Sequence, residues 1–157
     1  MAFTAPYFIS TYKQAAFAAT YKTGLLPSVL LAIAVDTSDA GNKPCSKICN
    51  NHFEIKPAQN SHHIRTWRVD DSHYIIYNDP YQCFHASVQL LKKWDRKKET
   101  NVFRAKKPET QLAKIATLLG MDETWQERLL QIIAAEMEGL DEEGSKLHKE
   151  WKEKASD

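Results

Sequence analysis

Apolar residues recur every three or four positions in the first third of the chain, a spacing typical of helices packed on a core. Phe8, Tyr12 and Ala16 share one face of a segment from Tyr7 to Lys22, and the glycine at position 24 is a natural helix end. A second segment begins at Pro27 and is apolar nearly all round through Val35. The pattern therefore predicts an amphipathic helix followed by a central, buried helix.

The middle of the chain changes to short pieces typical of strands. Residues 39–51 are polar and small, which predicts a loop, and residues 52–56, 64–69 and 73–77 each resemble a strand. Asp70, Asp71 and Ser72 separate the last two pieces and have the composition of a turn. We therefore expect those two pieces to pair as a β-hairpin.

The second half returns to helical spacing. Asn78-Asp79-Pro80 is typical of a helix start. The apolar face of the helix that follows contains Phe84, Val88, Leu91 and Trp94. A charged connector over residues 95–107 leads to a helix from Pro108 to Gly120. Another follows, with Thr124 and Glu127 at capping-box spacing. The fold class is therefore α+β and mainly helical.

The chain end is almost entirely charged. Gly139 and Gly144 punctuate this end, and over Ser145–Asp157 we expect a solvated or frayed helix with Trp151 as its only anchor. We expect a domain over residues 1–139 and a charged C-terminal tail over residues 140–157.

Composition excludes several functional classes. A chain of 157 residues suits one domain, and its formal net charge is +1 with no evident Lys/Arg stripe, which argues against a nucleic-acid partner. The longest apolar run, Leu25–Val35, is too short for a membrane span. No signal peptide is visible in Met1–Ser10, because no basic segment precedes an apolar one.

Cysteine and histidine spacing predicts neither a metal nor a cofactor. Three cysteines, Cys45, Cys49 and Cys83, cannot all pair, and we expect buried thiols. His62 and His63 are adjacent and point to opposite sides of a strand, so they chelate poorly. No metal site is expected.

Two blocks resemble the mannosyl-glycoprotein endo-β-N-acetylglucosaminidase-like family, the bacterial peptidoglycan glucosaminidases. The family pattern Leu-Ala-Gln-x-x-Leu-Glu-Ser-Gly-x-Gly is similar to Leu31–Asn42, and Asn-Asn-x-Phe-Gly-Ile-Lys is similar to Asn50–Lys56. The resemblance implies a lysozyme-like helical domain with a small β-hairpin lobe. It also implies a peptidoglycan or related glycan partner and a cell-envelope or secreted location.

The departures from the family pattern fall on functional positions. The family's catalytic Glu falls on Thr37, its strand Arg on Ile75, its Gly after Phe on Glu54, and its late Tyr on Met121. A hydroxyl has no proton to deliver near neutral pH, whereas glycoside hydrolysis needs a carboxylic acid at the leaving oxygen. The resemblance therefore predicts a degenerate, inactive member.

Two nearby carboxylates could replace the missing acid. Asp36 lies about 100° around the helix from Thr37, and Asp39 lies just beyond the helix end. An ordinary surface or turn role is the simpler explanation for both residues. An active enzyme with a relocated acid remains an alternative, as does a protein–protein scaffold whose cleft has been filled.

Glycan binding could persist without catalysis, because sugar faces stack on aromatic rings and amides recognise acetamido groups. The candidate binding residues are Asn51, Phe53, Trp67, Tyr74 and Tyr77. Tyr77 matches a family Tyr, while Phe53 alternates with Ile55 as a packing residue would.

Overall fold

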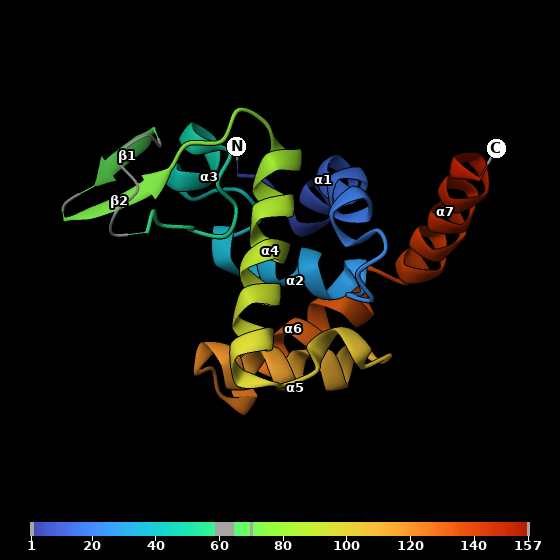
Figure 1. Ribbon diagram of the computed structural model, residues 1–157. Coiled ribbons are helices and arrows are strands. Elements are labelled where there is room, and N and C mark those ends of the chain that lie inside the picture. Colours follow the sequence, from blue (N-terminus) through green and yellow to red (C-terminus); the bar gives the residue numbers. More distant parts are fainter. Residues whose placement is uncertain (1, 59–64, 70, 157) are drawn as a thin grey trace.

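The computed structural model describes residues 2–58, 65–69 and 71–156, and it is a helical body with one small hairpin (Figure 1). The hairpin lies at one side of the body and the last helix at the other (Figure 1). The mainly helical α+β class predicted from the sequence is confirmed. The elements are α1 (Ala5–Thr20), α2 (Pro27–Ser38), α3 (Pro44–Cys49), β1 (Thr66–Val69), β2 (Ser72–Ile75), α4 (Pro80–Lys98), a 3-10 turn η1 (Val102–Arg104), α5 (Pro108–Leu119), α6 (Glu123–Glu136) and α7 (Leu140–Ala155).

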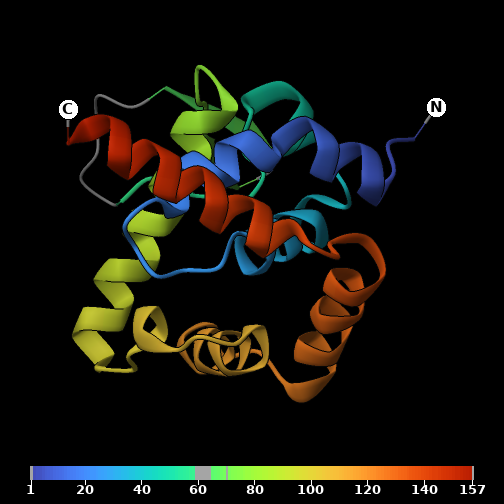
Figure 2. The ribbon, with the colours of Figure 1, turned by 90° about the vertical axis from the view of Figure 1, so that its right-hand side faces the viewer.

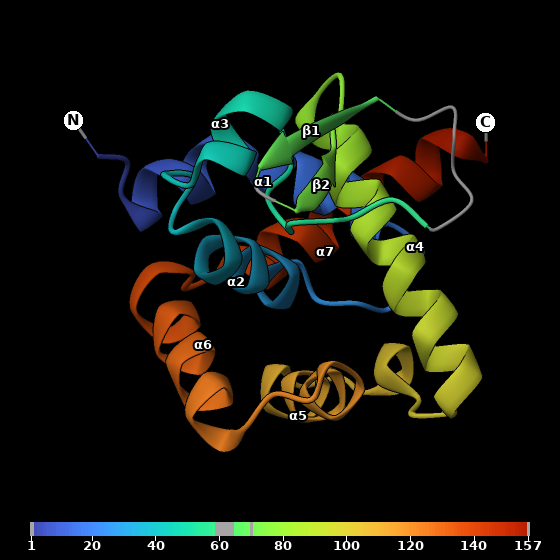
Figure 3. The same cartoon turned by 90° about the vertical axis from the view of Figure 1, so that its left-hand side faces the viewer.

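Helix α2 is the centre of the molecule, as its apolar pattern predicted. Ten of its residues are buried, and it contacts α1, α5, α6 and α7. Figure 3 shows α2 between the hairpin and the pair α5 and α6. None of the described helices is both long and apolar enough to cross a membrane.

The region between α2 and the hairpin differs from the prediction at two points. The expected loop over residues 39–51 contains the short helix α3, which Pro44 begins and in which Cys45 and Cys49 are buried one turn apart. Residues 52–56 form no strand, because Asn51 binds Ile55 through its side chain and closes a turn instead.

The hairpin and the helix that follows it agree with the sequence. Strands β1 and β2 are antiparallel, with Trp67 opposite Tyr74 and Val69 opposite Ser72. Asp79 caps α4 by accepting a hydrogen bond from Gln82 N at 2.9 Å. Helix α4 continues to Lys98, so the first part of the predicted connector is helical.

Helix α6 begins two residues earlier than the capping-box spacing suggested. Asp122, not Thr124, is the N-cap residue, and its carboxylate accepts from Trp125 N at 3.0 Å. An aspartate at this position also places negative charge at the positive end of the helix dipole.

Helix α7 is attached at several points, so the expectation of Trp151 as its one anchor was wrong. Asp141 accepts hydrogen bonds from the backbone N–H and hydroxyl of Ser28, at 2.9 and 2.6 Å. His148 donates to the carbonyl of Phe17 at 2.7 Å, and Trp151 packs against Tyr21. Figure 2 shows α7 lying across α1. This close packing explains why a glycine occupies position 144 inside α7, because a Cβ there would lie 3.0 Å from the Phe17 ring.

Candidate functional site

Thr37 lies near the end of α2 and faces a small apolar cavity, which we call the Thr37 cavity. Its volume is about 130 Å³. Helix α4 forms the opposite wall, and the segment after α3 forms a third side. The lining residues are Leu30, Ile33, Thr37, Phe53, Ile55, Ser87, Leu90, Leu91, Trp94 and Leu119.

The Thr37 cavity contains no ionisable side chain among these lining residues. Its hydroxyl groups are those of Thr37 and Ser87, and the Ser87 hydroxyl donates to the carbonyl of Phe84 at 2.7 Å. The surroundings would suit a protonated carboxylic acid, since an apolar pocket favours its neutral form. The residue at that position is nevertheless a threonine.

The two candidate substitute acids point elsewhere. Asp36 faces α6, where its Oδ1 accepts from Arg128 Nε at 2.7 Å and its Oδ2 accepts from Arg128 Nη2 at 3.2 Å. Asp39 is the exposed C-cap residue of α2, in the left-handed region with φ 50°. Neither residue lines the Thr37 cavity.

Asn51 is buried and holds the local backbone together. Its Nδ2 donates to the carbonyls of Ile55 and Ile75 at 2.9 and 3.0 Å, and its Oδ1 accepts from Ile55 N at 2.9 Å. Both amide hydrogens are therefore used inside the protein, and neither remains for a sugar. The geometry favours a structural role, in which Asn51 joins the segment after α3 to strand β2.

His52, the next residue of the same block, is a neutral core histidine. Its ring is surrounded by Tyr12, Phe8 and Phe84, with centroids 4.5, 5.3 and 5.9 Å away. Burial lowers the pKa of His52 to about 4. Nδ1 lies 2.5 Å from the hydroxyl of Ser46, whereas Nε2 is buried and has no partner among the described side chains.

Three free, buried thiols lie beside this histidine, as expected from the sequence. Burial raises the pKa of Cys45 and of Cys83 to about 12, so both are protonated at neutral pH. Cys83 Sγ also accepts a hydrogen bond from His52 N at 3.4 Å. Across the described residues, no group of three His, Cys, Asp or Glu side chains could hold a metal ion.

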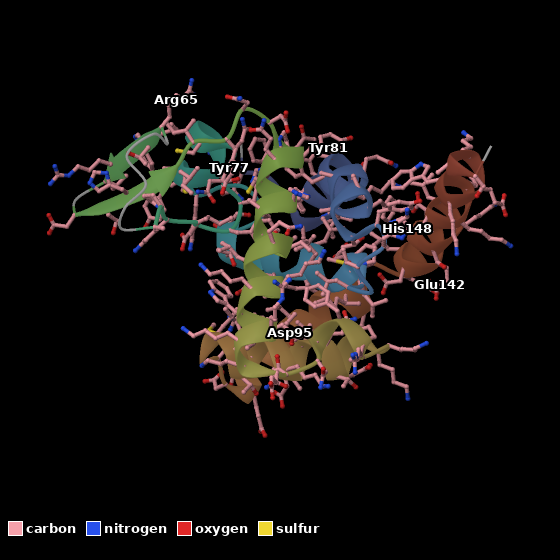
Figure 4. The ribbon with its side chains drawn as sticks, viewed as in Figure 1. Arg65, Tyr77, Tyr81, Asp95, Glu142 and His148 are labelled. Carbon is pink, nitrogen blue, oxygen red and sulfur yellow. The ribbon has the colours of Figure 1, made fainter. Side chains whose placement is uncertain are left out.

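Tyr77 packs against these thiols. Its backbone N–H donates to Cys49 O at 2.8 Å, and the side chain is half-buried. Burial, with the nearby Cys83 and Cys45, raises the pKa of Tyr77 well above its usual value. Figure 4 labels Tyr77 between the hairpin and the start of α4. Tyr77 does not line the Thr37 cavity.

Of the three remaining predicted binding residues, one lies at the Thr37 cavity and two lie on the hairpin. Phe53 lines the Thr37 cavity and makes an edge contact with Phe84 at 5.1 Å between centroids. Trp67 and Tyr74 are cross-strand neighbours with centroids 6.5 Å apart, half-buried on one face of the hairpin. Of the five predicted binding residues, the Thr37 cavity includes Phe53 alone.

Sequence reasoning missed the most exposed aromatic residue of the Thr37 cavity. Trp94 was assigned to the inner face of its helix, but it is 38% exposed and also borders a second hollow with Lys97, Lys98 and Leu118. Its position three residues beyond Leu91, the last buried residue of α4, and beside the basic last turn of the helix was a usable signal. Leu119, equally exposed, completes the rim from α5.

Comparison with known proteins supplies the context for this geometry. The family model for mannosyl-glycoprotein endo-β-N-acetylglucosaminidase matches residues 13–138. A search of the curated proteins returned no match. Among solved structures, the chain is similar to the catalytic domain of the autolysin Auto from Listeria monocytogenes, with 20% identity, a TM-score of 0.71 and coverage of 90% of each chain. This likeness confirms the lysozyme-like helical fold with a small hairpin.

Proposed function

We propose that this chain, which belongs to the mannosyl-glycoprotein endo-β-N-acetylglucosaminidase family, binds N-acetylglucosamine-containing strands of peptidoglycan without cleaving them. Family membership indicates a peptidoglycan-related glycan hydrolase or binder. The observation that supports binding without cleavage is the Thr37 cavity, because it contains no carboxyl group among its lining residues.

The chemical argument concerns the proton that the leaving oxygen must receive. A general acid contributes roughly 10²–10⁴-fold to such a reaction. The hydroxyl of Thr37 cannot take its place, since it does not release a proton near neutral pH. A family member with threonine at this position would therefore hold a glycan strand and leave its glycosidic bond intact.

The positions of the neighbouring carboxylates support the same conclusion. Both oxygens of Asp36 accept hydrogen bonds from Arg128 on α6, on another side of α2 from the Thr37 cavity. Asp39 is exposed beyond the end of the helix. For Asp36 to act as the acid, the C-terminal turn of α2 would have to unwind and give up its packing.

The Thr37 cavity suits the uncharged parts of an N-acetylated sugar. Its apolar walls can accept the methyl of an acetamido group, and its volume of about 130 Å³ is too small for several sugar rings. Trp94 and Phe53 provide aromatic surfaces, of which the Trp94 ring is partly exposed at the rim. We infer that a sugar face packs on Trp94 while its acetamido group enters the cavity.

Two assays on purified, insoluble peptidoglycan test this proposal together. The first measures muropeptide release, and we expect none above background at high protein concentration. Release by the unaltered chain would refute inactivity, and its loss in Asp39→Asn would identify a relocated acid.

The second assay measures co-sedimentation with the same peptidoglycan. We expect the chain to bind and Trp94→Ala to weaken binding at least about tenfold, as the loss of an aromatic contact predicts. Tyr81→Ala is the matched control, because Tyr81 is an exposed aromatic residue on the same helix and is 52% exposed. Figure 4 labels Tyr81 at the start of α4. Equal binding by both variants would contradict the role of the Thr37 cavity, and no binding at all would favour the protein–protein scaffold.

A further inference from the structure

Positive charge is concentrated at the end of α4 and in the segment that follows it. Residues 92–107 contain eight Lys or Arg and two Asp or Glu, whereas residues 122–157 contain five Lys or Arg and eleven Asp or Glu. The total charge of +1 conceals this segregation. A binding surface for anions can therefore exist on a chain that is nearly neutral overall.

The structure gathers part of this charge around an open cavity of about 660 Å³, which we call the basic cavity. It lies on a different face of α4 from the Thr37 cavity, beside the segment after α1 and the turn η1. Figure 4 labels Asp95, one of its residues, at the end of α4 that is remote from the hairpin. The lining residues are Lys22, Thr23, Lys92, Asp95, Arg96, Glu99, Asn101, Phe103 and Arg104.

The four cations of the basic cavity are not neutralised by carboxylates, although Lys22 Nζ lies over the Tyr21 ring, 5.3 Å from its centroid. Among the described residues, none of Lys22, Lys92, Arg96 and Arg104 forms a salt bridge. Arg96 and Arg104 are exposed. The carboxylate of Asp95 accepts from Thr100 Oγ1 at 2.5 Å and from Val102 N at 3.0 Å, so it holds the turn rather than a cation.

The walls of the basic cavity are held in place by long-range contacts. The buried side chain of Gln111 donates to the carbonyls of Gly24 and Ala105 at 2.9 and 2.8 Å, and accepts from Leu26 N at 3.0 Å. These bonds join the segment after α1 to the segment after η1. A preformed site loses less conformational entropy on binding than a flexible one.

Charge balance indicates the class of ligand. The lining residues carry four cations and two carboxylates, a formal net charge of +2. A phosphate monoester carries about −1.5 to −2 at pH 7, whereas a single carboxylate carries −1. Two arginines also suit phosphate oxygens, to which each can donate two parallel hydrogen bonds.

The size of the basic cavity indicates that the phosphate belongs to a larger molecule. Small-molecule sites are commonly about 300–1,000 Å³, and a free phosphate would leave most of this cavity empty. Phe103 offers an apolar ring and Asn101 an amide, the groups that recognise a sugar face and its hydroxyls. We propose that the basic cavity binds a phosphorylated sugar, separately from the glycan site at Thr37.

The test is a calorimetric titration of the full chain at low ionic strength. The ligands are N-acetylglucosamine 6-phosphate, N-acetylglucosamine, inorganic phosphate and a short DNA oligonucleotide. We expect the sugar phosphate to bind more tightly than inorganic phosphate and the neutral sugar not to bind at this site. Binding of the sugar phosphate should also weaken below about pH 6, where the phosphate takes up a proton.

Variants then locate the site. Arg96→Gln with Arg104→Gln should weaken binding of the sugar phosphate at least about tenfold, since hydrogen bonds to a charged group are lost. Lys149→Gln with Lys152→Gln removes the same charge from exposed positions on α7 and should change binding less than about twofold.

Three results would overturn the proposal: no binding of the sugar phosphate, an equal loss in both double variants, or tighter binding of a DNA oligonucleotide to the same two arginines. All of these readouts are independent of peptidoglycan binding, so failure here leaves the proposed function untouched.

Discussion

Lowering the pH should destabilise the protein through His52. The ring is buried among aromatic side chains, and burial lowers its pKa to about 4 from an ordinary 6.5. The unfolded chain therefore takes up a proton on His52 at a higher pH than the folded chain does. The resulting stability is complete above pH 6.5 and is lost as the pH falls from 6.5 to about 4.

The size of the effect follows from the same two pKa values. The gap between 6.5 and about 4 corresponds to a loss of about 3 kcal/mol at low pH, of which about 2 kcal/mol is already lost at pH 5. The hydrogen bond between Ser46 and Nδ1 does not offset the cost of protonating His52 in the folded state. In the protonated ring, Nε2 would carry a proton without a partner in an aromatic environment.

Urea unfolding between pH 7.5 and pH 4.5 measures this loss. Carboxylates also titrate over part of this range, so each variant is compared with the unaltered chain. His52→Gln should remove the histidine contribution and flatten the pH dependence, at some cost in stability at pH 7.5. His85→Gln, at an exposed position on α4, should leave the pH dependence unchanged. Parallel curves for the two variants would refute the burial argument.

Three further changes test the packing that positions the site. Gly24→Ala should destabilise the fold by more than about 2 kcal/mol in urea unfolding, because φ is +87° and a Cβ would lie 2.2 Å from the Phe103 carbonyl oxygen. Gly120→Ala is the control: its φ is also positive, but the space around it is open, so the substitution should cost only about 1 kcal/mol. Asn51→Ala should cost about 2–4 kcal/mol in the same assay, since it leaves buried backbone groups unpaired, and a cost under about 1 kcal/mol would contradict its structural role. Asp36→Asn should cost less than about 1 kcal/mol in the same assay, because its arginine partner is half-exposed, and a cost above about 2 kcal/mol would contradict this reasoning.

Local signals were sufficient to predict most helices and the hairpin. The apolar face of α1, the all-apolar α2, the Asp79-Pro80 start of α4 and the end of α5 at Gly120 each depend on residues within a few positions of one another. The same information located Thr37 near the end of α2. A pattern of this kind predicts an element because helix and strand periods are properties of the local backbone.

Contacts between distant segments decided the rest. Asn51 closes a local turn with Ile55 where a strand was expected, and it joins this turn to strand β2 because its Nδ2 also donates to the Ile75 carbonyl, 24 positions later. The charged segment near the chain end is helical, as expected, but it is attached to the body because Asp141 reaches Ser28.

Sequence alone predicted that Thr37 stands where the resemblance places a family acid, because that prediction depends on position along one helix. Only the tertiary structure decided what surrounds Thr37 and the cations near the end of α4. Both cavities are formed by chain segments far apart in the sequence, namely α2, α4 and α5 for one, and the segment after α1, α4 and η1 for the other. No local sequence pattern predicts contacts between such distant segments, because these contacts depend on how the helices pack around a shared core.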